Sequence, residues 1–381
     1  MLRTKDGSTG RLLQLCAGYF VFYVITGVTV KYFLGPLDRG LPQLKGIEFL
    51  VYSTAGGMMV GTTVVLVLRW YRLKSNRTFE LGGRQVPVEL LYIIPSGICT
   101  AVVIPTTTLM YTLPISVMVA MVIMRGSVIV ISRIVDALQI RSGILDKKVY
   151  WQENVAVCFA IGAVAVHLVY ASFVASGKGN FDFVGNAAAM TILSSYIAAY
   201  AIRIYIMNYY KNTRPKGAKS DNRGFFAVEQ LSAVVALLFI SVFIYFAPSL
   251  FGVTGERIEL FIGAIDRPRP EWASAIVAGM AFGVVAFFSV FIFMYKGRTA
   301  TFAGLVNRLT SLIAGTVATL IFAVAYGGKM PKVQDWVSLG FIFVAVAFLS
   351  QAEKRRSAEL ILTHEVEDDA APSTLAAPEK A

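Results

Sequence analysis

Residues 117–141 read VMVAMVIMRGSVIVISRIVDALQIR, an apolar run that holds Arg125 near its middle. In a helix, a run of this length is long enough to cross a hydrocarbon core of about 30 Å. Placing a guanidinium at the centre of a bilayer costs from about 3 to more than about 10 kcal/mol, so such a residue normally faces water, a partner or a ligand. The run therefore predicts a membrane helix with a functional arginine.

The composition is that of a polytopic membrane protein. Of 381 residues, 56% are hydrophobic and only 15% are charged, and the mean hydropathy is +0.65. These values lie far outside the range of soluble domains. Apolar runs recur from end to end and leave no room for a sizeable soluble domain.

Ten runs are long enough to cross a membrane as helices. The predicted spans are 11–33, 47–70, 88–110, 115–138, 152–174, 183–207, 225–246, 272–295, 299–326 and 334–351. An even number of spans places both termini on the same side.

The basic residues indicate which side that is, because cytoplasmic loops are rich in Lys and Arg. The loops on the side of the termini hold 23 of them near helix ends and the opposite loops hold 9. We therefore expect both termini in the cytoplasm. The net charge of +12 then reflects membrane topology, and we expect no nucleic-acid partner.

A repeat links the two halves of the chain. Arg125 and Arg308 each sit in a long apolar run and lie 183 positions apart, and Trp151 and Trp336, which open the next runs, lie 185 apart. A repeat of five helices must be inverted in the membrane, and inverted repeats are typical of transporters that bind their substrate near the midplane. The predicted fold is an all-α integral membrane protein with ten transmembrane helices in two inverted five-helix repeats.

The repeat also predicts the domain organisation. We expect a cytoplasmic N-terminus over 1–10, a first repeat over 11–174, the start of the second repeat with a flexible linker (208–224) over 175–224, and the remainder over 225–352. The segment 353–381 starts basic, turns acidic and ends in AAPSTLAAPEKA, a composition that cannot bury a core. We expect a disordered cytoplasmic tail there.

With ten helices in two halves, the chain resembles the drug/metabolite transporter superfamily over residues 10–352. The most specific piece is Met124-Arg125-Gly126-Ser127-Val128-Ile129, which is similar to the fourth-helix motif of solute-carrier family 35 members, nucleotide-sugar transporters among them, and of EamA-like proteins. The mid-helix proline and the Gly-Glu-x-Leu turn of the usual EamA pattern are missing. The resemblance implies that the fourth and ninth helices line a central cavity.

Four residues on those two helices are the predicted substrate ligands: Arg125, Ser132, Arg308 and Ser311. Helical spacing places Arg125 and Ser132 on one face, and Arg308 and Ser311 on another. A guanidinium presents a planar fork of donors that suits phosphate or carboxylate. The alternative is that each arginine pairs with a carboxylate or with helix carbonyls and only fixes the packing.

Four charged residues are candidates for gating or coupling: Glu48, Glu229, Arg133 and Asp136. Glu48 and Glu229 lie 181 positions apart, so they are plausible repeat mates that close a gate on an arginine. The alternative for Glu48 is an acid favoured by the helix dipole at a helix start. The alternative for Asp136 is an i,i+3 ion pair with Arg133.

Two patterns predict helix geometry. Pro95 and Pro105 fall inside the third span and should bend or break it, since each removes a backbone donor. The glycines at 56, 57 and 61, and those at 279 and 283, are of the GxxxG kind, which allows helices to approach closely.

The other singular residues favour no enzymatic chemistry. Cys16, Cys99 and Cys158 lie in apolar runs without metal-ligand spacing, so we expect inert thiols. His167 is either a proton relay or a packed, neutral residue. The chain has no GxxxxGK[ST] stretch, no HExxH and no paired carboxylates. We expect no catalytic residue, no metal, no cofactor and no enzyme activity.

These observations favour a secondary active transporter that moves a small anionic metabolite, such as a sugar phosphate or nucleotide sugar, by alternating access. One alternative is a proton-coupled exporter of drugs or organic cations, with Glu229 or Glu48 carrying the proton. The other is a non-transporting membrane scaffold or lipid-handling protein. We expect a monomer or homodimer in a cell inner or plasma membrane rather than an organelle membrane.

Overall fold

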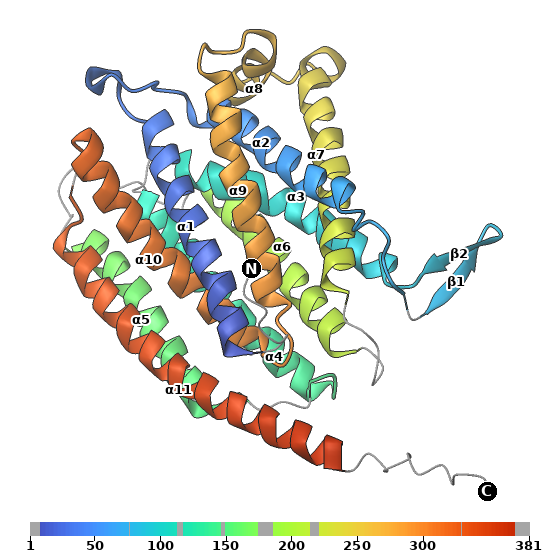
Figure 1. Cartoon of the computed structure of the whole chain (residues 1–381). Coiled ribbons are helices and arrows are strands. Elements are labelled where there is room, and N and C mark those ends of the chain that lie inside the picture. Colours follow the sequence, from blue (N-terminus) through green and yellow to red (C-terminus); the bar gives the residue numbers. More distant parts are fainter. Residues whose placement is uncertain are drawn as a thin grey trace, which may run out of the picture.

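Helices make up almost all of the computed structural model, which describes residues 8–75, 77–112, 117–145, 149–173, 186–213, 221–328 and 330–369 (Figure 1). Its elements are α1 (Thr9–Phe33), η1 (Leu37–Arg39), α2 (Gly46–Val67), β1 (Thr78–Leu81), β2 (Arg84–Pro87), α3 (Leu90–Thr112), α4 (Val117–Arg141), α5 (Trp151–Phe173), α6 (Ala187–Asn212), α7 (Asn222–Phe251), α8 (Glu256–Asp266), α9 (Trp272–Phe293), α10 (Ala300–Tyr326) and α11 (Val333–Asp369).

The prediction of a multi-pass helical membrane protein is confirmed. A helix lies at each of the ten predicted positions. By length and composition, eight helices in the described ranges can cross a membrane: α1, α2, α3, α6, α7, α9, α10 and α11. The charged helix α4 and its neighbour α5 lie in the same bundle (Figure 1).

The helices pack in a few dominant pairs. Helix α2 lies along α9 and α3 along α7, while α1 packs on both α9 and α10 and α6 packs on both α3 and α4. Helices α5 and α11 run side by side at one edge of the bundle (Figure 1). Helices α4 and α10 contact each other between these groups.

Glycines let α2 and α9 meet backbone to backbone, as the small-residue pattern predicted. A Cβ atom added to Gly279 would lie 2.2 Å from the carbonyl oxygen of Ser53, and one on Gly283 would lie 2.4 Å from that of Gly57. A glycine also brings the backbones of α3 and α7 close together, since a Cβ on Gly97 would lie 2.6 Å from the carbonyl oxygen of Glu229. Close backbone approach is the main means of helix association in lipid.

Helix α3 is continuous despite its two prolines. Pro105 leaves the carbonyl of Ala101 without its helical donor. Next to it, Thr106 and Thr107 donate their hydroxyls to the carbonyls of Val102 and Val103, both at 2.7 Å. A break at this position, which the prolines allowed, does not occur.

The start of α1 and the Glu353 region of α11 lie at the same end of the bundle. Thr9 donates to Glu353 at 3.0 Å, and Ser8 accepts a bond of 2.6 Å from the hydroxyl of Tyr295. Helix α8 lies at the opposite end (Figure 1). We call the end that carries Thr9 and Glu353 the terminal end.

The expected disorder from residue 353 onward is wrong for the start of that segment. Helix α11 continues to Asp369, and Glu353 and Arg356 are buried. Tyr150, just before α5, donates its hydroxyl to Glu359; partial burial and this bond raise the pKa of Tyr150 to about 12. Glu353, Arg356 and Glu359 thus pair with groups elsewhere in the chain. Residues 370–381 lie outside the described residues.

Two connections carry structure that the sequence reading left as loops. Strands β1 and β2 form an antiparallel hairpin that pairs Leu81 with Arg84. Its turn uses Gly82 and Gly83, both with positive φ, as a two-residue hairpin turn requires. Helix α8 occupies the predicted surface loop between α7 and α9. In the predicted linker, α6 extends to Asn212 and α7 begins at Asn222, and 214–220 lie outside the described part.

Replacing Gly279 with Val should destabilise the protein by about 1–3 kcal/mol, because the side chain meets the backbone of Ser53. The measurement is the thermal midpoint of the purified protein in detergent. Gly340→Val is the matched control, since a Cβ at this exposed glycine meets nothing within 4 Å. Equal midpoints for the two variants would contradict the close α2–α9 contact.

Candidate functional site

A cavity of about 90 Å³ lies inside the bundle. It is lined from α1, α2, α3, α4, α6, α7, α9 and α10. Its polar wall consists largely of tyrosines and arginines: Tyr19, Tyr23, Tyr196, Tyr200, Arg125, Arg203 and Arg308. Its apolar wall includes Val103, Ile104, Met124, Phe282 and Val285. The cavity is therefore concave, largely enclosed by helices and basic on one side.

Arg125 of α4 reaches this cavity, as the sequence predicted for a mid-membrane arginine. The residue is 4% exposed. It donates through Nη1 to Ser311 of α10 and through Nη2 to the hydroxyl of Tyr23 of α1. Its guanidinium carbon lies 4.8 Å from the centre of the Tyr23 ring. Its Nε atom has no partner among the described residues.

Arg308 of α10 lines the same cavity and is less well satisfied. It is 5% exposed, and its guanidinium carbon lies 4.8 Å from the centre of the Tyr200 ring. Within the described ranges, its Nε and Nη2 atoms find no hydrogen-bond partner. A buried donor left unpaired costs about 1–3 kcal/mol, so an acceptor entering the cavity would gain that energy.

The tyrosine partners form a motif that the sequence reading missed. Residues 19–23 read YFVFY and residues 196–200 read YIAAY, so Tyr-x-x-x-Tyr recurs at an offset of 177. The two rings of each pair lie on one helix face, with centroids 5.5 Å apart in α1 and 4.8 Å apart in α6. The offset, close to that of the two arginines, was the signal that could have found them.

A third arginine, Arg203 of α6, is neutralised by Glu229 of α7. Arg203 Nε and Nη2 lie 2.8 and 3.1 Å from the two carboxylate oxygens. Glu229 also accepts from Ser96 at 2.7 Å and from Thr100 at 3.3 Å. Arg203 is one of the 23 basic residues counted near helix ends on the side of the termini, but the residue is buried inside the helix. The position of Arg203 along α6 does not by itself indicate that its partner is Glu229 on another helix.

The cavity therefore keeps a net positive charge. Glu229 offsets Arg203, and neither Arg125 nor Arg308 forms an ion pair with a carboxylate in the described part of the chain. Two guanidinium charges thus remain uncompensated inside the bundle. An anion is the kind of ligand that such an arrangement can accommodate, because a cation removed from water needs a counter-charge.

The predicted ligands Ser132 and Ser311 have different positions. Ser311 holds Arg125 and donates to the carbonyl of Arg308 at 2.8 Å. Ser132 lies outside the cavity lining, where its hydroxyl donates to the carbonyl of Val128 at 2.8 Å. It fills the α4–α10 contact, since a Cβ on Gly304 would lie 2.3 Å from its Oγ.

Glu48 also lies away from the cavity. Its carboxylate accepts from the backbone N–H of Lys45 at 2.7 Å and so caps the start of α2. Arg269, which is half-exposed, approaches it to 3.8 Å. This is the helix-start arrangement that we gave as the alternative to a gate.

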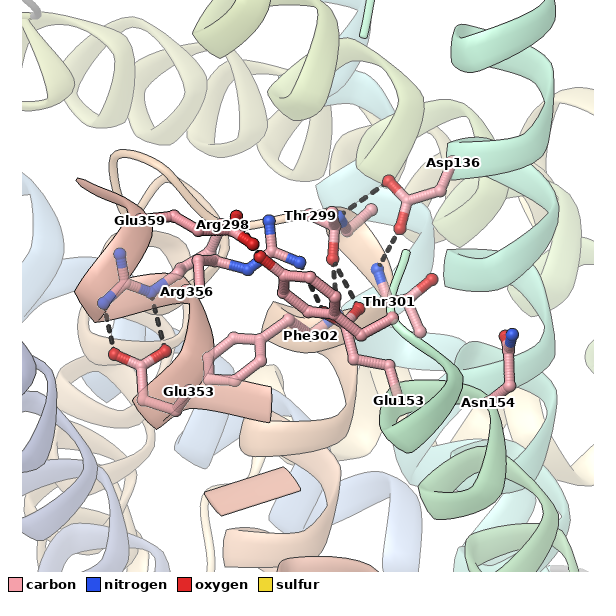
Figure 2. Close-up of polar contacts among 12 residues, drawn as sticks. Asp136, Glu153, Asn154, Arg298, Thr299, Thr301, Phe302, Glu353, Arg356 and Glu359 are labelled. Carbon is pink, nitrogen blue, oxygen red and sulfur yellow. Dashed lines mark hydrogen bonds and ion pairs between the residues drawn. The ribbon is translucent and has the colours of Figure 1, made fainter. Parts of the chain in front are cut away.

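Asp136 and Arg133 do not pair with each other. Arg133 donates to Asn154 of α5 at 2.9 Å. Asp136 accepts from the backbone N–H groups of Ala300 and Thr301 at 2.8 and 2.6 Å (Figure 2). A carboxylate in this position satisfies the free N–H groups at a helix start and its dipole. The predicted i,i+3 pair is wrong because Asp136 reaches across to α10.

A buried ion-pair network surrounds the same helix start (Figure 2). Glu153 of α5 accepts from Arg356 of α11 at 2.5 Å and from Thr299 at 3.0 Å. Arg298 forms an ion pair with Glu353 of α11. The terminal end of α10 is thereby joined to α4, α5 and α11.

Other candidates add no second site. The thiols of Cys16, Cys99 and Cys158 are free, and no group of three His, Cys, Asp or Glu side chains that could hold a metal occurs among the described residues. The side chain of His167 lies outside the described part.

Comparison with known proteins bears on the fold alone. No protein-family model matches the chain, and no curated protein matches it. A solved structure described only as a crystal structure of a protein is similar to it with a TM-score of 0.53 and 13% sequence identity. The likeness covers 91% of this chain and 99% of that one, so nearly the whole helical arrangement also occurs in a protein solved by crystallography.

Replacing Arg356 with Ala should cost about 3–5 kcal/mol of stability, because it leaves Glu153 as a buried charge without its cation. Thermal unfolding in detergent measures the loss. Lys354→Ala, two residues away on the exposed side of α11, should change the midpoint little. A stable Arg356→Ala protein would show that the network does not hold the terminal end together.

Proposed function

We propose that this chain is a secondary active transporter that moves a small anionic metabolite by alternating access. The observation that carries the proposal is the pair of buried arginines, Arg125 and Arg308, which line one cavity and keep donor atoms without an acceptor among the described residues. An anion that enters the cavity supplies both the missing acceptors and the missing counter-charge.

The packing of the helices supports two inverted five-helix repeats, with α8 as an insertion. In this scheme α1, α2, α3, α4 and α5 correspond in order to α6, α7, α9, α10 and α11. When each helix is replaced by its counterpart, every dominant helix pair becomes another pair that is also in contact. The α2–α9 pair becomes α7–α3, and α1–α10 becomes α6–α4. The same exchange turns Arg125 on Tyr23 into Arg308 on Tyr200. Such a duplicated site suits a transporter that opens to each side in turn.

This duplication, with the fourth-helix motif, favours membership of the drug/metabolite transporter superfamily, among EamA-like proteins or relatives of solute-carrier family 35. The excess of Lys and Arg in the loops at the terminal end favours a cytoplasmic location for both termini. Binding of the anion between the two halves requires only one chain, so a monomer suffices and a homodimer is compatible.

The positive cavity weighs against the two alternatives. A cation exporter needs a carboxylate facing its substrate, and the described cavity lining contains none, because Glu229 faces Arg203, Ser96 and Thr100. A scaffold or lipid-handling protein has no use for uncompensated charges in the centre of a closed bundle.

Arg125→Ala and Arg308→Ala should each weaken anion binding by about 2 kcal/mol or more, which is about 30-fold in Kd. Thermal stabilisation of purified protein, measured across sugar phosphates, nucleotide sugars, carboxylates and lipophilic cations, reports binding without knowledge of the coupling ion. Arg133→Ala is the matched control, since this arginine of the same helix lies outside the cavity.

Stabilisation by an anion in the native protein and Arg133→Ala, but not in the two cavity variants, supports the proposal. Stabilisation by cations alone, unchanged in all variants, would overturn it and leave the arginines a structural role.

A further inference from the structure

We propose that the ligand of this cavity is a small dianion and that Glu229 sets this charge preference by cancelling Arg203. The inference rests on the proposed anion-transport function and narrows its substrate class. The sequence reading treated Glu229 as a gate or proton carrier. The geometry assigns it a different role, that of fixing how many positive charges an anion meets.

The charge count follows from the hydrogen bonds around Glu229. Both of its oxygens accept from Arg203, at 2.8 and 3.1 Å, and the first also accepts from Ser96 and Thr100. Acceptance at both oxygens from four donor atoms is the pattern of an ionised carboxylate. Arg203 is therefore matched within the protein although it lines the cavity. Arg125 and Arg308 supply the remaining two charges.

The position of these two charges suits a compact ligand. Arg125 bonds Ser311, which sits one turn beyond Arg308 on α10 and bonds its carbonyl. Tyr19 lines the cavity together with both arginines. The two guanidinium groups thus border the same part of the cavity, one from each half of the chain. A dianion placed there neutralises both, whereas a monoanion leaves one buried charge unmatched.

The volume of the cavity favours a compact ligand. The space amounts to about 90 Å³, whereas a cavity of about 150 Å³ takes a ring the size of benzene. A short dicarboxylate or a phosphate monoester with a short carbon chain therefore suits it better than a nucleotide sugar, with its carbons against Val103, Ile104 and Phe282.

An isosteric series separates charge from shape. Succinamide, succinamate and succinate share size and carry no, one and two negative charges at neutral pH. We expect succinate to bind the native protein at least about tenfold more tightly than succinamate at low ionic strength, and succinamide not to bind. Methyl phosphate tests whether the dianion is a phosphate ester, and a uridine-diphosphate sugar tests the size limit.

Three variants test the role of Glu229 through the net charge of the cavity. Glu229→Gln frees Arg203 and should tighten succinate binding by about tenfold. Arg203→Met combined with Glu229→Met removes the matched pair and should keep the native preference. Arg308→Gln leaves one charge and should bind succinate and succinamate about equally. If Glu229→Gln does not fold, the ligand preferences of the double variant and of Arg308→Gln test whether the net charge of the cavity sets its selectivity.

The outcomes separate this inference from the proposed function. Succinamate binding as tightly as succinate, or tight binding of the uridine-diphosphate sugar, overturns the small-dianion inference and leaves anion transport intact. A Glu229→Gln protein that folds with unchanged affinity, or a double variant that loses the preference, overturns the role of Glu229. If no anion binds the native protein, the proposed function itself fails.

Discussion

Burying guanidinium groups in a bundle surrounded by lipid is costly, and that cost governs where this chain places its polar side chains. A charged group in the bilayer centre needs a counter-charge, hydrogen-bond partners or water. Arg203 has Glu229, and Arg298 and Arg356 have Glu353 and Glu153. Of the buried arginines in the described residues, Arg125 and Arg308 lack such a carboxylate, and they rest on tyrosine rings instead.

Tyrosine is a useful neighbour for an arginine that must remain available. A ring face attracts a cation by about 0.5–2 kcal/mol, less than a carboxylate would in the same place. The arginine is held in position while its charge stays uncancelled. Tyr23 and Tyr200 thus contact Arg125 and Arg308 without cancelling their charge. A carboxylate in either position would close the site with an internal ion pair, as Glu229 does for Arg203.

The cavity and the network at the terminal end share helix α10. Its first residues are held by Asp136 and Glu153, and Arg308 lies about two turns further along. Any movement that opens the cavity toward the terminal end must therefore break or carry along these contacts. The pairs α2–α9 and α3–α7 are built differently, with glycines that bring the two backbones close together at the contact. Such pairs are suited to move as rigid units.

The sequence by itself determined the membrane class, the positions of the ten predicted helices and the presence of Arg125 and Arg308 inside long apolar helices. These follow from hydrophobic length and from the cost of a charge in lipid, which act locally along the chain. Only the tertiary structure decided what those charges meet. From the sequence, Arg203 was grouped with residues near helix ends, Asp136 was paired with Arg133, and residues 353–359 were assigned to a disordered tail. The actual partners of these residues lie 26 to more than 200 positions away in the sequence. A side chain's partner depends on which helices pack together, and that packing is settled by glycine contacts and ion pairs between distant segments, which no local pattern encodes.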